Sequence, residues 1–285
     1  MRISVLSVMV IVMVVLQVGC GSGSGDFADD AGVAADASVA LDLGSRSLSP
    51  LGKQGGTGSG SRIIFQRVSG GHITVGRVQA DNLVEGEERP PSDVQVGEYL
   101  IASTELTRAQ WLALDGSAPW MYVLQVAGGT TDISDPELPA VGMTRTQVQT
   151  FCQQFSPSGW RLALPTPAQW EHAALAGAAT RFSWGDSMGD SFVKRHANVW
   201  LETPSGDDTV LLPHTVGLHQ ANGYGLFDMH GNVWEMTSAG GATKMIVCGG
   251  AWDQPVLQAR ASNRMEVPAD VGLPTVGVRL ILVKE

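Results

Sequence analysis

Blocks of apolar residues predict short strands near both ends of the globular part of the chain. Residues 63–68 and 72–76 are two such blocks separated by the Ser-Gly-Gly segment at 69–71, a pattern typical of a β-hairpin with a glycine turn. Residues 94–101 and 276–283 are mostly apolar, and each predicts one further strand. These strands flank a middle region with a different periodicity.

Three helices are predicted in that middle region by one repeated device, the pattern Thr-x-x-Gln. It begins at Thr107, Thr144 and Thr166, and it forms a capping box in which the Thr hydroxyl and the Gln side chain each satisfy a free backbone N–H. Pro167 suits the first helical position, and Gly177 is expected to end that helix. The second helix places four apolar residues on one buried face, namely Val148, Phe151, Cys152 and Phe155.

Helical periodicity fades after about Gly185, where Trp, Gly, Asn, Pro and Asp dominate. Together with the strands, this predicts an α+β fold with long ordered loops. The 35 glycines among the 285 residues agree with a loop-rich architecture. A net charge of −10 gives no electrostatic basis for binding nucleic acid, so that class of partner is excluded.

The first twenty residues indicate export. Arg2 precedes an almost wholly apolar run at residues 3–18, which is typical of a secretory signal. The end of the run and the two residues after it read Leu-Gln-Val-Gly-Cys at positions 16–20, which resembles the lipobox of bacterial lipoproteins. We therefore expect a signal peptide over residues 1–19 and lipidation of Cys20. An ordinary cleaved signal and an uncleaved anchor are the alternatives.

Residues 20–61 are rich in Gly, Ser, Ala and Asp, a composition that is expected to form a flexible tether. A lipid and a tether would hold a domain of residues 62–285 at the membrane of the bacterial cell envelope without embedding it.

Four segments, in order, resemble the formylglycine-generating enzyme (sulfatase-modifying factor) family. They are residues 161–174, the Phe-Ser-Trp-Gly turn at 182–185, residues 222–237 with Gly-Asn-Val-Trp-Glu, and residues 249–279 with Gly-Gly-Ala-Trp and a closing Gly-Val-Arg. The resemblance implies an α+β, C-type lectin-like fold of the formylglycine-generating enzyme type across roughly residues 65–283.

The resemblance also implies calcium as a structural cofactor. In the family, the turn at Gly231 and Val233 binds calcium through backbone carbonyls, and the Glu235 carboxylate completes the site. Asn198 and Val199 match a second family site, whose acidic partner would be Asp207 or Asp208. Calcium prefers six to eight oxygen ligands of these kinds. The alternative is that Asn232 and Glu235 tie loops together by hydrogen bonds.

The copper site of the family's enzymes is missing from the sequence. Those enzymes oxidise a substrate cysteine with copper(I) held by two thiolates, and soft thiolates suit copper(I). The corresponding interval, residues 253–259, contains no Cys, and only Cys152 and Cys248 remain beside Cys20. Copper is therefore not expected. A Cys152–Cys248 disulfide is left open in an exported protein.

Other chemistries find less support. The family's iron-dependent branch takes His ligands from an N-terminal helical domain for which residues 21–61 offer no His. The six His are expected to be scattered loop and surface residues, and neither a Gly-x-Ser-x-Gly elbow nor a phosphate-binding loop occurs. Trp170, Trp184 and Trp234 are expected in the core, and Arg279 is expected to be structural.

A groove is the remaining candidate, formed where the family lines its substrate cleft, by Trp252, Asp253, Arg260, Asn263 and Arg264. The two arginines are equally consistent with structural bonds to loop carbonyls. The sequence leaves two functions open. The first is a non-catalytic module that binds a peptide, protein or glycan at the cell envelope, and the second is a formylglycine-generating oxidoreductase with a divergent site.

Overall fold

A six-stranded sheet with the order β2-β1-β3-β6-β12-β7 is the centre of the fold. The computed structural model describes residues 38–44, 46–50, 60–76, 90–115, 117–121, 135–201 and 212–285, without the side chains of residues 50, 114 and 115. These residues belong to one compact unit, Val33–Glu285. The strands of the six-stranded sheet are β1 (Val39–Asp42), β2 (Ser47–Pro50), β3 (Arg62–Val68), β6 (Tyr99–Ala102), β7 (Trp160–Ala163) and β12 (Ile281–Lys284). All its pairings are antiparallel.

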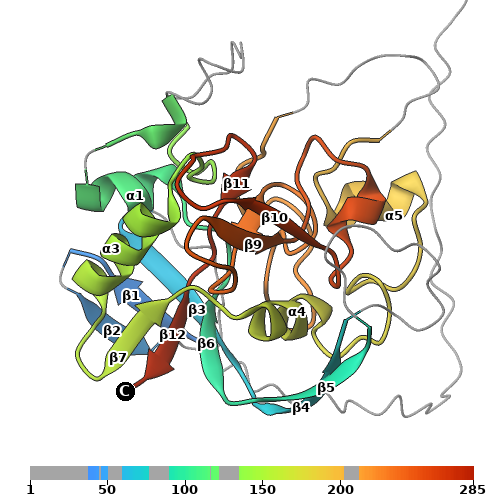
Figure 1. The fold of residues 1–285 in the computed structure, drawn as a ribbon, viewed down its shortest axis with the longest axis horizontal. Coiled ribbons are helices and arrows are strands. Elements are labelled where there is room, and N and C mark those ends of the chain that lie inside the picture. The colour runs from blue at the N-terminus through green and yellow to red at the C-terminus, as the bar shows by residue number, and fades with distance from the viewer. Residues whose placement is uncertain are drawn as a thin grey trace, which may run out of the picture. The chain divides into compact units, whose positions relative to one another are not determined.

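Two smaller sheets accompany it (Figure 1). One has the order β10-β9-β8-β11, and the other is the ribbon β4-β5. Their strands are β4 (Gly71–Val75), β5 (Ser92–Val96), β8 (Trp234–Met236), β9 (Lys244–Cys248), β10 (Arg264–Pro268) and β11 (Val276–Gly277). The helices are α1 (Arg108–Asp115), α3 (Arg145–Phe155), α4 (Pro167–Leu175), α5 (Asp190–His196) and the 3₁₀ turn η2 (Val256–Ala259). No described helix is long and apolar enough to span a membrane.

The six-stranded sheet is buried on both faces, because successive side chains of a strand point to opposite sides. Leu100 and Leu282 pack into a large core with α1 and α3, where Trp111 stacks on Phe151 with ring centroids 5.4 Å apart. Tyr99, Ile101 and Ile281 face a second core that contains Trp170, Ala173 and Ala174 of α4. The α4 helix thereby lies against β4, β5 and β9.

All three predicted capping boxes are present. At Thr144 and Thr166, each hydroxyl accepts from the N–H of the Gln three residues on, and the Gln side chain bonds back to the Thr N–H. Thr107 and Gln110 make the same pair of bonds, at 3.2 and 2.9 Å. The predicted buried face of α3 is also confirmed. The α4 helix ends one residue earlier than the Gly177 prediction, at a left-handed Ala176 with a φ of 48°.

The predicted hairpin of residues 63–76 is wrong in its pairing, although both strands exist. The β3 strand pairs with β6, and β4 pairs with β5, in one continuous register that joins Val68 to Tyr99 and Gly71 to Val96. The segment β3–β4 therefore pairs with the segment β5–β6 as one long antiparallel ribbon, which is interrupted at Gly70. A Cβ on Gly70 would lie 2.5 Å from the Val96 carbonyl oxygen, so this crossing requires glycine.

Two further expectations need correction, and one helix was not expected. The tether is predicted over residues 20–61, yet β1 pairs with β3, and Leu41 and Leu43 lie in the large core. The ordered domain therefore already includes β1 and β2. The strand expected at 276–283 is divided, because β11 belongs to the four-stranded sheet and β12 to the six-stranded one. The α5 helix, only seven residues long, was not predicted. Cys20 and residues 1–19 lie outside the described residues.

Candidate functional site

The Gly-Asn-Val-Trp-Glu turn packs directly on the Asn198 segment, so the structure brings two sets of predicted site residues together. Gly231 and Asn232 both have positive φ angles, 93° and 61°. The Asn232 N–H donates to the Asn198 carbonyl at 2.7 Å, and the Gly231 N–H donates to the Gly249 carbonyl at 2.7 Å. A Cβ on Gly231 would lie 2.3 Å from the Asn198 carbonyl oxygen, which explains glycine at this position.

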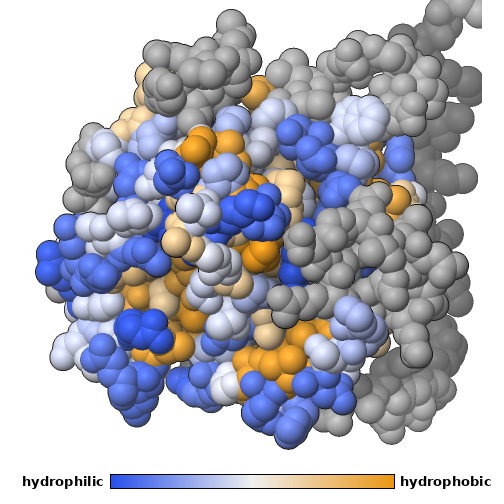
Figure 2. Space-filling view, viewed as in Figure 1, coloured by the Kyte–Doolittle hydropathy of each residue, from blue (hydrophilic) through white to orange (hydrophobic). Residues whose placement is uncertain are grey.

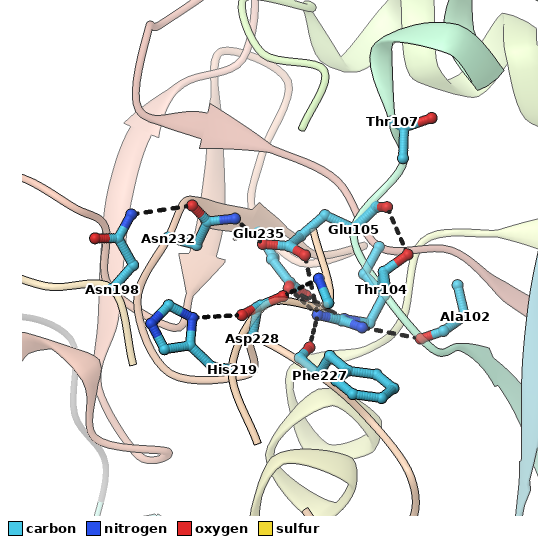
Figure 3. A network of polar contacts seen from close by, with 12 residues as sticks. Ala102, Thr104, Glu105, Thr107, Asn198, His219, Phe227, Asp228, Asn232 and Glu235 are labelled. Carbon is cyan, nitrogen blue, oxygen red and sulfur yellow. Dashed lines mark hydrogen bonds and ion pairs between the residues drawn. The ribbon is translucent and has the colours of Figure 1, made fainter. Parts of the chain in front are cut away.

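The Asn232 side chain joins three segments (Figure 3). Its Nδ2 donates to Glu105 Oε1 at 2.8 Å, and its Oδ1 accepts from the His214 backbone N–H at 2.8 Å. Asn198 Nδ2 donates to the same Oδ1 at 3.3 Å and to the Leu212 carbonyl at 2.9 Å. Asn232 is 1% exposed, so these bonds satisfy a buried amide.

The Glu235 carboxylate is saturated with hydrogen-bond donors. Arg279 Nε donates to both of its oxygens at 3.0 Å, and Arg279 Nη2 adds a bond to Oε1 at 2.8 Å. Trp170 Nε1 donates to Oε2 at 2.6 Å. Three N–H groups, one of them shared between the two oxygens, therefore bond this carboxylate.

Arg279 is the positive centre of a fully buried cluster that contains two more carboxylates, Glu105 and Asp228. Its guanidinium also donates to the carbonyls of Ala102 at 3.0 Å and Phe227 at 2.7 Å. Burial lowers the pKa of Arg279, but Glu235 and Glu105 raise it by more. Burial, followed by the charge of Asp228, raises the pKa of Glu105 well above its ordinary value.

Asp228 is held by its own partners at the edge of this cluster (Figure 3). Its carboxylate accepts from the Gly217 N–H at 2.6 Å and lies 3.1 Å from His219 Nδ1. The His219 ring stacks on His214, with centroids 5.6 Å apart. Both residues lie in a loop, which agrees with the prediction of scattered loop and surface His. His214 is exposed and His219 is half-buried, whereas His230 is a loop residue that is only 2% exposed and so does not lie on the surface.

The residues present do not fit calcium at Glu235, because Arg279 already supplies the compensating positive charge. The Asn198 carbonyl accepts the Asn232 N–H, while these contacts do not involve the Gly231 and Val233 carbonyls that the prediction names. In the described part of the chain, no three His, Cys, Asp or Glu side chains form a group that could hold a metal ion. Asp207 and Asp208 lie outside the described residues, so the second calcium site, with Asn198 and Val199, stays a prediction.

The five groove candidates do not form one surface. Arg260 is fully buried and donates to the Leu257 carbonyl at 2.7 Å, and Asn263 Nδ2 bonds both the carbonyl and the side-chain oxygen of Gln258 at 2.7 Å. Arg264 pairs with Glu171 at 2.8 Å. Trp252 and Asp253 are half-buried, and burial raises the pKa of Asp253. Arg260 and Asn263 thus hold the η2 turn in place.

Both described cysteines are buried and unpaired. Cys152 lies on α3 in the large core, and Cys248 ends β9 in the second core. The disulfide that the sequence left open is therefore not formed. Burial raises the pKa of Cys152 to about 12 and that of Cys248 still further, which keeps both as thiols at neutral pH.

These features define an α+β domain in which a glycine-rich turn is locked by a buried Glu–Arg pair. The chain belongs to the family described as the sulfatase-modifying factor enzyme 1-like domain, whose profile matches residues 63–284.

Curated relatives include active and inactive proteins. The chain is 42% identical over 79 residues to the formylglycine-generating enzyme of Mycobacterium tuberculosis, covering 26% of each chain. It is 29% identical over 178 residues to that of Bos taurus, covering 60% of this chain and 43% of the relative. It is also 29% identical to the inactive C-alpha-formylglycine-generating enzyme 2 of Mus musculus, covering 56% and 54%. The chain thus spans about half or less of these relatives' lengths.

Solved structures agree with the fold. Treponema denticola variable protein 1 superimposes with a TM-score of 0.62 at 19% identity, covering 82% of this chain and 99% of that one. PvdO from Pseudomonas aeruginosa also gives 0.62, at 20% identity, covering 79% and 99%. At these identities the likeness establishes the fold alone.

Proposed function

We propose that this chain is a non-catalytic formylglycine-generating enzyme-like module that binds a peptide, protein or glycan at the bacterial envelope. The observation that carries the proposal is the position of the two described thiols. They lie on different elements and in different cores, Cys152 on α3 and Cys248 on β9. Copper(I) chemistry of the family's kind needs two thiolates that converge on one metal ion.

The surroundings of each thiol support the same conclusion. Cys248 is 0% exposed, and Arg264 opposes it across the β9–β10 ladder. Cys152 is 6% exposed on the face of α3 that packs against the core. A substrate cysteine could not reach Cys248 without opening this core. The inactive relatives at 29% identity show that the family includes proteins without the activity.

A copper and aldehyde assay tests the proposal. The reduced full-length protein is incubated with copper(I), oxygen and a cysteine-containing substrate peptide, and the aldehyde product is captured with an aminooxy probe. We expect no aldehyde and no stoichiometric copper, because no thiolate pair is available. The formylglycine-generating enzyme of Streptomyces coelicolor, which is 31% identical over 142 residues, is the positive control.

The opposite result would identify the divergent oxidoreductase. Aldehyde formation that disappears in Cys248→Ser and persists in Cys152→Ser would show that Cys248 works as a copper ligand despite its burial. That outcome would overturn the non-catalytic proposal.

We further propose that the chain is exported and anchored by lipidation of Cys20, on the strength of the lipobox-like segment at residues 16–20. Cys20→Ala is expected to abolish incorporation of a labelled fatty acid and to move the protein from the membrane to the soluble fraction. Cys152→Ala, in the buried core, is the matched control and should retain the label. Labelling that survives Cys20→Ala would contradict the anchor.

A further inference from the structure

A cavity of about 260 Å³ lies where the start of α4 faces the β4–β5 ribbon, and the function proposed above does not use it. Its walls include Val75, Val94, Pro167, Ala168, Ile246 and Arg264. Figure 2 shows hydrophobic surface in this region, surrounded by hydrophilic residues. Of the five residues expected to line the family's substrate groove, Arg264 lines this cavity, and Trp252, Asp253, Arg260 and Asn263 do not. The cavity therefore shares Arg264 with the expected groove, and its other walls come from α4, β9 and the β4–β5 ribbon.

Arg264 is the one charged residue in the described lining of the cavity, and its side chain is only 8% exposed. Arg264 Nη2 donates to Glu171 Oε2 at 2.8 Å, and Glu171 in turn accepts from the Gly76 N–H at 2.6 Å. Arg264 Nε, by contrast, is buried and has no hydrogen-bond partner among the described residues. A buried N–H of a charged group without an acceptor is costly, so its position against a cavity indicates a missing acceptor.

A second donor lies on the same cavity, at the first turn of α4. The Thr166 hydroxyl accepts the Gln169 N–H, and the Thr166 N–H is bonded to Gln169 Oε1. Pro167 has no N–H. The Ala168 N–H is thus the first-turn donor for which the described residues provide no acceptor. The partial positive charge of a helix start favours an anion at such a donor.

We propose that this cavity binds a monovalent carboxylate carried on a short aliphatic group. Arg264 Nε and the Ala168 N–H would donate to the carboxylate, while Val75, Val94 and Ile246 would enclose the aliphatic part. A single negative charge fits because Glu171 already neutralises part of the Arg264 charge. The lining includes no aromatic side chain on which a sugar or base could stack.

Calorimetric titration of the full-length protein with N-acetyl-leucine and its neutral amide tests this proposal. The acid is expected to bind at least about tenfold more tightly, because only the acid supplies charged acceptors to both donors. Inorganic phosphate is expected to bind more weakly than the acid. Equal affinity for acid and amide, tighter binding of phosphate, or binding of neither leucine compound would each overturn the proposal.

Two variants test the location of the site independently. Glu171→Gln/Arg264→Gln removes both charges of the buried pair together, and Val94→Phe fills the cavity without touching either donor. Each is expected to reduce the affinity for N-acetyl-leucine by at least about tenfold. Arg181→Gln is the control, since Arg181 does not line this cavity. Val94 takes no part in the Arg264–Glu171 ion pair. Unchanged affinity for N-acetyl-leucine in Val94→Phe would therefore overturn the proposed location.

The source of the carboxylate is distinguished by a further comparison with isovalerate and with a tripeptide that ends in leucine. Tighter binding of the tripeptide would support a peptide C-terminus as the natural ligand. Equal binding of isovalerate would support a free branched-chain acid.

Discussion

Arg279→Met is expected to lower the free energy of unfolding by about 3–5 kcal/mol, the cost of leaving a buried charge without its partner. Arg279 is 0% exposed and bonds both oxygens of Glu235. Among the described residues, its removal would leave Glu235 with one side-chain donor, Trp170 Nε1, and would remove the positive charge that lies 3.8 Å from Glu105. Met has a similar length and no charge, so the loss would reflect electrostatics and hydrogen bonds more than a cavity.

Urea unfolding of the purified variants measures this effect, with an exposed ion pair as the matched control. Lys244 and Glu266 lie 3.1 Å apart on β9 and β10, with side chains 61% and 35% exposed. Lys244→Met should cost no more than about 1 kcal/mol, because water and salt screen such pairs. A similar loss of unfolding free energy in both variants would show that the buried pair stabilises the fold no more than the exposed one.

The double variant Arg279→Met/Glu235→Gln separates the pair from its surroundings. Removing both charges is expected to recover part of the loss, since the cost of breaking a buried pair is mainly that of the charge left behind. Simple addition of the two single losses would instead mean that Arg279 acts chiefly through its bonds to the carbonyls of Ala102 and Phe227.

Elements whose signals are local could be predicted from the sequence. The capping boxes at Thr107, Thr144 and Thr166 depend on residues three apart, so their patterns identified the starts of α1, α3 and α4. The pairing of β3 with β6 depends on residues more than thirty positions apart, and the glycines at 70 and 97 look like turn residues until the second strand is known. The same limitation applies to β1, whose Gly-, Ser- and Ala-rich neighbours conceal the buried Leu41.

The sequence identified several residues of the candidate site, but it did not show which groups they bond. The Gly231–Glu235 turn and Asn198 do meet, and Arg279 is structural as expected. The resemblance could not show that Arg279 reaches Glu235, because the two are 44 positions apart. Glu105 was missed because it is a single acid in the segment Ser-Thr-Glu-Leu-Thr, with no motif to mark it, and its role depends on contact with Asn232.

His230 is expected to make the protein less stable as the pH falls from about 6.5 to 4. Burial lowers the pKa of His230 from 6.5 to about 4 in the folded protein, and the charge of His196 lowers it further, while bonds to backbone carbonyls oppose the shift. His230 Nε2 accepts the Ser183 N–H at 3.1 Å, and Nδ1 lies 2.8 Å from the Ala259 carbonyl, so the neutral ring is the one that fits. Between these pH values the unfolded chain binds a proton that the folded protein does not.

The loss should reach about 3 kcal/mol at pH 4, because 2.5 pKa units correspond to that free energy, and no further loss from this group follows below pH 4. Glu105 acts in the opposite direction, since a raised carboxyl pKa favours the fold at low pH and loses that stability as the pH rises above 4.5. Urea unfolding of the native protein and of His230→Gln at several pH values isolates the histidine. The variant loses ring contacts with Phe182 and Trp184 at every pH, so only the difference in slope counts. Parallel pH profiles for the two proteins would show that His230 takes up its proton without opening the core.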